Sequence, residues 1–148
     1  MRLPKTVIWE AWCIHFSALG PISAPRGHHG GPWQNELEKN QNMGLKDAMQ
    51  SAKDSYAADI DAGFHMLHID PSVDIHEKPN IDQVLDRVYE LYDFCWDYAQ
   101  RKNQDIIFEI GTEEQSGGNN SQEELEYTLE CMQKFCKSNK MPFPSFVV

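Results

Sequence analysis

The stretch from Asp105 to Gly118 reads DIIFEIGTEEQSGG and combines the pattern of a strand with that of a loop. Its first half, Ile106 to Ile110, is a short apolar run rich in β-branched residues, which is typical of a buried strand in a parallel sheet. Glu109 lies inside this run, and an ionised carboxylate is costly to bury without a partner. We therefore expect Glu109 to face a cation, a hydrogen-bond donor or a polar cavity.

The second half of the stretch predicts a loop followed by a helix. Glu113 and Glu114 come directly after the strand, and Ser116-Gly117-Gly118 is flexible. A helix then opens at Ser121, where Glu124 completes a capping box. A strand that delivers acidic residues into a glycine-bearing loop before a helix is how βα-barrels build their sites. The alternative is a buried Glu paired to a neighbouring Lys or Arg, with solvated acids in the loop.

The chain alternates helix and strand patterns three times, which calls for parallel strands joined by right-handed crossovers. Asp70, Glu109 and Val148 recur at an equal spacing that suits successive βα units. Asn80 with Gln83 predicts a second capping box at the start of a helix. The predicted elements are a helix over 45–62 capped by Gly63, a strand over 64–69, a helix from Asn80 to Arg101, a strand over 106–110, a helix from Ser121 and a strand over 143–148.

The length of the chain limits how much of a barrel it can form. A full barrel needs about 200 residues or more, and the chain has 148 and stops inside an apolar strand. We expect a partial (β/α) TIM-type barrel over residues 27–148, apparently a fragment, after a poorly defined N-terminal segment over residues 1–26. Half a barrel cannot close on itself, so we expect the isolated chain to self-associate or aggregate.

Composition narrows the classes of partner and compartment. The formal net charge is −10 and Lys and Arg form no run, which argues against nucleic acid and anionic membranes as partners. No stretch approaches the roughly 20 apolar residues of a transmembrane helix, and no signal-peptide pattern is present. Cys13, Cys95, Cys131 and Cys136 form no Cys-x-x-Cys pair, and the last three occur in apolar helical patterns as core thiols do. We expect a reducing, cytoplasmic location.

The ends of parallel strands open onto one face of a sheet, and this face would gather several polar residues. Histidine and carboxylate groups in an open cavity suit a catalytic zinc or a similar divalent ion. Such an ion polarises a carbonyl oxygen and stabilises an enediolate, as sugar aldol cleavage and isomerisation require. Backbone amides at Gly30, Gly31 and the Ser116-Gly117-Gly118 loop could hold a phosphate. The residues gathered are His28, His29, His68, Asp70, Glu109, Glu113 and Glu114.

Each candidate also has a structural alternative. The paired histidines before Gly30 are compatible with a solvated surface loop. His68 can be a satisfied core histidine, and it alternates with His65, so only one of the two points into a barrel. Asp70 precedes Pro71 and can simply cap the following turn.

Three motifs resemble the non-catalytic subunit family of class II D-tagatose-1,6-bisphosphate aldolase. They are Gly27-His28-His29-Gly30-Gly31-Pro32-Trp33-Gln34, His68-Ile69-Asp70-Pro71-Ser72 and Glu109-Ile110-Gly111-Thr112-Glu113. They occur in the family's order and spacing, from about Gly27 to the C-terminus. The resemblance implies a TIM barrel related to zinc-dependent class II aldolases, with a place in galactitol and amino-sugar catabolism. Members of this family support a separate catalytic aldolase subunit, and related barrels act as metal-dependent sugar epimerases.

Carried onto this sequence, the resemblance makes His29 a metal-binding histidine, and Asp70 and Glu109 the other acidic strand ends. His28 stands where the family has Asp, so we expect an accessory, non-catalytic subunit that binds a sugar phosphate and the catalytic aldolase subunit or a second copy of itself. The alternative is a metal-dependent sugar or sugar-phosphate epimerase, isomerase or aldolase, and a third interpretation is a truncated copy without activity. The predicted site has Glu109, Glu113 and Asp70 as catalytic groups, Gly30, Gly31, Ser116 and Gly117 as substrate-binding groups, and His29, His68 and Glu109 as ligands of zinc or another divalent ion.

Overall fold

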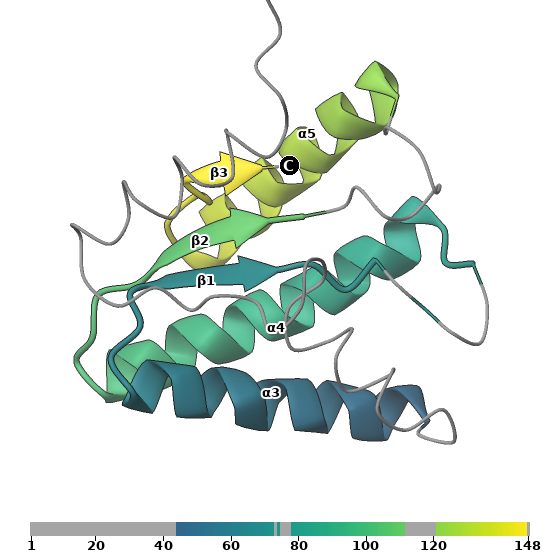
Figure 1. Cartoon of the computed structure of the whole chain (residues 1–148). Helices are drawn as coiled ribbons and strands as arrows, with labels where there is room; N and C mark the ends of the chain where they lie inside the picture. The colour runs from purple at the N-terminus through teal and green to yellow at the C-terminus, as the bar shows by residue number, and fades with distance from the viewer. Residues whose placement is uncertain (1–43, 73, 75–77, 112–120, 148) are drawn as a thin grey trace, which may run out of the picture.

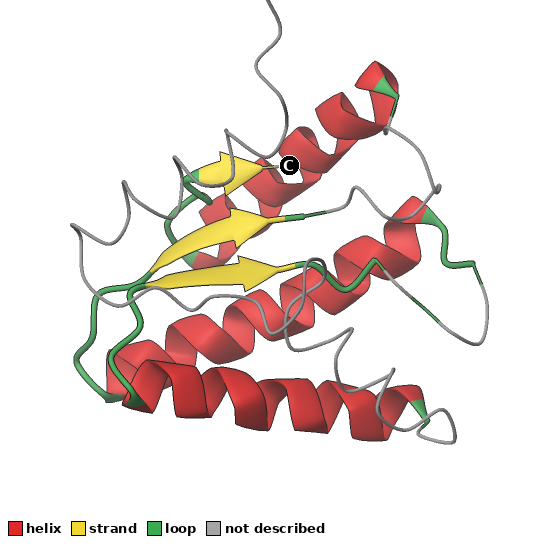
Figure 2. Cartoon of the chain, in the orientation of Figure 1, coloured by secondary structure: helices red, strands yellow, loops and turns green. Residues whose placement is uncertain are grey.

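The computed structural model describes residues 44–72, 74, 78–111 and 121–147. Helices and strands alternate along these residues, as the sequence predicts (Figures 1 and 2). No helix in this part of the chain is long and apolar enough to cross a membrane. The elements are α3 (Leu45–Asp61), β1 (Met66–Ile69), α4 (Ile81–Arg101), β2 (Ile107–Ile110), α5 (Gln122–Asn139) and β3 (Phe146–Val147).

The strands form one parallel sheet in the order β1-β2-β3, so that their order in space follows their order in the chain. Sheets that grow in this way by right-handed crossovers keep their connecting helices on one face. Figure 1 shows α4 running between α3 and α5 on one side of the sheet. The mixed α/β fold with parallel strands is therefore confirmed, whereas three strands do not close a barrel. The N-terminal segment over 1–26 lies outside the described residues.

Local signals in the sequence explain where the helices begin and end. In α4 the Asn80 side chain accepts from the Gln83 amide at 3.0 Å, and the Gln83 side chain accepts from the Asn80 amide at 2.8 Å. A second reciprocal pair, Ser121 with Glu124, opens α5. Gly63 follows α3 with φ of 84°, a left-handed conformation in which glycine has no steric penalty. All three caps were predicted and are confirmed.

The hydrophobic core lies between the helices and one face of the sheet. Tyr92 of α4 stacks on Phe108 of β2 with ring centroids 3.9 Å apart. The Tyr92 hydroxyl donates to the Pro142 carbonyl at 2.8 Å, so the ring is buried without leaving its polar atom unpaired. Alternating strand residues complete this core, namely Leu67, Ile69, Phe108, Ile110 and Val147. Cys95 and Cys136 are buried free thiols, as predicted, and Cys131 is partly buried.

Some apolar residues that the sequence pattern places in the core are exposed. Leu45 and Leu125 are each 37% exposed, at the first turns of α3 and α5. Ile107 is 39% exposed, because β2 packs on the helices only through its alternate residues Phe108 and Ile110. The strands are also shorter than predicted. β3 begins only after Pro144, which has no amide hydrogen to donate to a ladder.

Candidate functional site

The carboxyl ends of β1 and β2 bring His68 and Glu109 together. The two residues are direct partners in the parallel register. His68 Nδ1 lies 3.5 Å from Glu109 Oε1, with side chains 16% and 14% exposed, and the contact is an ion pair when the imidazole is protonated. The expectation that Glu109 faces a donor or a cation is confirmed. The cross-strand neighbour of Glu109 is a histidine, and the alternative of a Lys or Arg partner stays a prediction.

The backbone of His68 is held from the helix layer. The Tyr56 hydroxyl on α3 donates to the His68 carbonyl at 2.6 Å. Burial of the Tyr56 ring raises the pKa of this hydroxyl well above its usual value, so it stays a donor. His65 precedes β1, is exposed, and lies with its Nδ1 3.2 Å from the Asp105 carbonyl. His65 therefore belongs to the opposite end of the sheet.

Asp70 follows β1 directly and is only 1% exposed. Its Oδ1 accepts from the Ser72 amide at 3.0 Å, which closes a turn after the strand. The interpretation in which Asp70 caps its own turn is therefore confirmed. A Cβ atom at Gly111 would lie 2.8 Å from Asp70 Oδ2, so only glycine fits beside this carboxylate at the end of β2. The Gly111 amide donates to the Ile69 carbonyl at 3.0 Å, extending the ladder past the strand.

Arg87 of α4 donates hydrogen bonds to two residues that follow Asp70, Pro71 and Asp74. Its Nη2 donates to Asp74 Oδ2 at 2.7 Å and its Nη1 donates to the Pro71 carbonyl at 3.4 Å. The Arg87 side chain is 10% exposed and the Asp74 side chain is fully buried. Sequence reasoning missed Arg87. The available signal was its position three residues after Val84 and four before Leu91, which places it in the apolar stripe of α4.

The spacing of His68 and Glu109 is compatible with two ligands of one zinc ion. Zinc bonds of about 2.0–2.2 Å at tetrahedral angles place two ligand atoms roughly 3.3–3.6 Å apart. The observed 3.5 Å lies within that range. Among the described residues, however, no group of three or more His, Cys, Asp or Glu side chains is arranged to hold a metal. A third ligand would have to come from outside the described residues, and the sequence prediction assigns this role to His29.

Apart from His68, Asp70 and Glu109, all the predicted site residues lie outside the described part of the chain. These are His28, His29, Gly30, Gly31, Glu113, Glu114, Ser116 and Gly117. The structure brings together His68 with Glu109, and Asp70 with the position of Gly111. The predicted gathering of the other residues stays a prediction.

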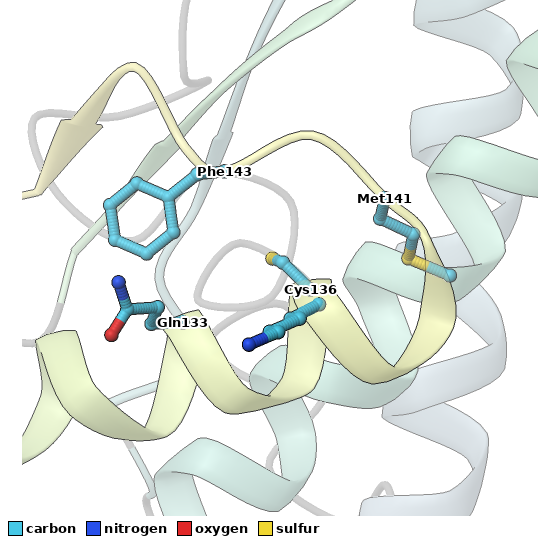
Figure 3. Close-up of a pocket in the computed structure, with 5 residues that line it drawn as sticks. Gln133, Cys136, Met141 and Phe143 are labelled. Atoms are coloured by element: carbon cyan, nitrogen blue, oxygen red, sulfur yellow. The ribbon is translucent and has the colours of Figure 1, made fainter.

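An open groove of about 500 Å³ lies at the other end of the sheet (Figure 3). The last turns of α5 and the connection from α5 to β3 form this groove. The connection lies at the amino ends of the parallel strands. Burial raises the pKa of the Cys136 thiol, partly offset by a hydrogen bond with Tyr92. The groove is lined by Gln133, Cys136, Lys137, Met141 and Phe143. It is separate from the strand ends that carry His68 and Glu109.

Comparisons with known proteins give no relative for this chain. No family model, no curated protein and no solved structure matches it. The family resemblance therefore rests on the sequence motifs alone.

Proposed function

We propose that the chain is part of a TIM-type barrel and acts in carbohydrate metabolism as an accessory, non-catalytic subunit of a class II tagatose-bisphosphate aldolase. The observation that carries this proposal is the pair His68 and Glu109, which face each other at the carboxyl ends of consecutive parallel strands. Barrel enzymes collect their functional groups at these ends. The sequential strand order, with the helices on one side, is the arrangement that a barrel segment requires.

The contacts of the Asp70 carboxylate support an accessory role over a catalytic one. A general acid or base must come within about 2.6–3.2 Å of the proton that it transfers. Asp70 Oδ1 accepts from the Ser72 amide and the carboxylate packs against Gly111, so both contacts stabilise the turn after β1. The resemblance adds that His28 replaces the family's aspartate. The proposal includes a cytoplasmic location and a sugar-phosphate ligand.

A second candidate function is a metal-dependent sugar-phosphate epimerase, isomerase or aldolase. The 3.5 Å spacing of His68 Nδ1 and Glu109 Oε1 favours it, since both atoms can bind one divalent ion. His68 and Glu109 would hold the ion together with His29. A bound zinc supplies Lewis-acid polarisation of a carbonyl oxygen. The residues of this chain would then orient the sugar at the strand ends.

The two candidates can be separated by assaying cleavage of D-tagatose 1,6-bisphosphate with and without a catalytic subunit of a class II tagatose-bisphosphate aldolase. We expect the chain alone, supplied with zinc, to give no turnover above a zinc-only blank. We expect its addition to the catalytic subunit to prolong or raise the activity of that subunit. Glu109→Gln should retain this support, because the accessory role does not use Glu109 in chemistry.

Two results would change the assignment. Turnover by the chain alone that Glu109→Gln abolishes would establish the enzyme and reject the accessory role. No effect on the rate or lifetime of the catalytic subunit, together with no turnover, would reject both candidates.

A further inference from the structure

Ser72 places a buried, unpaired hydroxyl just beyond the end of β1. The residue is 1% exposed, and its Oγ has no hydrogen-bond partner within the described residues. A hydroxyl that is removed from water without a partner destabilises a protein. A buried polar group of this kind at a strand end calls for an explanation beyond folding.

The loop around Ser72 is held firmly. Its own amide donates to Asp70 Oδ1 at 3.0 Å. The preceding carbonyl, that of Pro71, accepts from Arg87 Nη1 at 3.4 Å, and Arg87 also binds Asp74 at 2.7 Å. Hydrogen bonds thus hold the Pro71 carbonyl and the Ser72 amide. The hydroxyl is carried by an anchored turn, at the same end of the sheet as His68 and Glu109.

We propose that Ser72 Oγ forms a hydrogen bond with a hydroxyl group of a polyol ligand bound at the carboxyl ends of β1 and β2. A serine hydroxyl both donates and accepts, so it can pair with any sugar hydroxyl. The ligand class rests on the proposed function, and Ser72 deepens it by assigning a new contact.

The surrounding charges favour the polyol part of a sugar phosphate over its phosphate. Asp70 is adjacent in the turn, and Glu109 lies at the neighbouring strand end. Carboxylates accept hydrogen bonds from hydroxyl groups and repel phosphate. The nearest guanidinium, Arg87, is engaged by Asp74 at 2.7 Å.

The test compares Ser72→Ala with Thr128→Val. Thr128 is a matched control, because its Oγ1 is also buried without a partner among the described residues, and it lies on α5 instead of a strand end. Removing an unpaired hydroxyl should raise the melting temperature of either ligand-free protein, by about 2–4 °C. D-tagatose 1,6-bisphosphate is then titrated by calorimetry into the full chain with zinc. We expect its Kd to rise about tenfold in Ser72→Ala and to stay unchanged in Thr128→Val.

Several outcomes would overturn the inference. A Kd unchanged in Ser72→Ala, or a lower melting temperature in that ligand-free variant, would remove Ser72 from the site. Inorganic phosphate is the second probe, and an equal loss of phosphate affinity in Ser72→Ala would overturn the assignment to polyol hydroxyls. If the wild-type chain binds no bisphosphate, this inference and the ligand of the proposed function both fail. If binding depends on Ser72 but the catalytic subunit is not supported, only the accessory role fails.

Discussion

The two faces of the sheet differ in the kind of side chain that they carry. On the helix side, Leu67, Ile69 and Ile110 are completely buried, and Phe108 is 1% exposed. On the other side, the same two strands present the His68–Glu109 pair and two apolar residues, Met66, which is 5% exposed, and Ile107, which is 39% exposed. Because side chains alternate along a strand, four consecutive residues can serve both purposes. One face provides the packing that fixes the strands, and the other offers the polar groups that this packing positions.

The largest expected effect tests this contrast on adjacent residues of β2. Phe108→Ala should lower the free energy of unfolding by about 3–5 kcal/mol, because it leaves a cavity beside Tyr92. Ile107→Ala should cost about 1 kcal/mol, because its side chain is already partly in water. Urea denaturation followed by circular dichroism measures both. Similar losses for the two variants would show that both faces of β2 are packed equally.

Arg87 is the charged side chain among the buried residues of α4, and its removal should have the next largest effect. Arg87→Met removes the ion pair between Arg87 and the fully buried Asp74 carboxylate, which should cost about 3 kcal/mol. The matched control is Arg101→Met on the same helix. Arg101 pairs with Asp97 at 3.2 Å while 62% exposed, so its loss should change stability by less than about 0.5 kcal/mol. Denaturation of both variants decides the matter, and equal costs would mean that the Asp74 pair is effectively solvated.

The sequence predicts this fold best where the signal is local. The capping boxes at Asn80 and Ser121 and the left-handed Gly63 depend on residues within one turn, and all were predicted from spacing alone. The position of Glu109 within an apolar run also predicted its surroundings, because a carboxylate inside an apolar strand requires a polar neighbour in any fold.

Identities of distant partners could not be predicted in the same way. That His68 lies opposite Glu109 follows only from the register of β1 on β2. The link between Arg87 and Asp74 depends on where Asp74 lies relative to α4, which no periodicity encodes. The exposure of Ile107 likewise depends on which face the helices cover, and an apolar run is compatible with either face.

Gly111 offers a smaller test at the boundary between the two faces. Gly111→Ala would place a Cβ atom 2.8 Å from Asp70 Oδ2 and 2.9 Å from Asp70 Cβ and Cγ, so the turn after β1 must shift. We expect a loss of about 1–3 kcal/mol from this overpacking. Gly44→Ala is the control, since no atom lies within 4 Å of its Cβ position, and there the cost should stay below about 1 kcal/mol. Thermal melting compares the two, and equal shifts would show that Asp70 moves aside freely.

The smallest effect concerns the interaction that makes the polar face distinctive. In a double-mutant cycle with His68→Gln and Glu109→Gln, we expect a coupling free energy of about 0.5–1 kcal/mol at pH 5.5. The value is modest because the Nδ1–Oε1 distance is 3.5 Å and both side chains keep some contact with water. The same cycle at pH 8.5 should give a smaller coupling, because histidine is charged only when protonated and ordinarily titrates near ~6.5. The readout is the free energy of unfolding in urea at each pH. A coupling that is the same at both pH values would show that charge does not hold the pair together, and that register alone places His68 against Glu109.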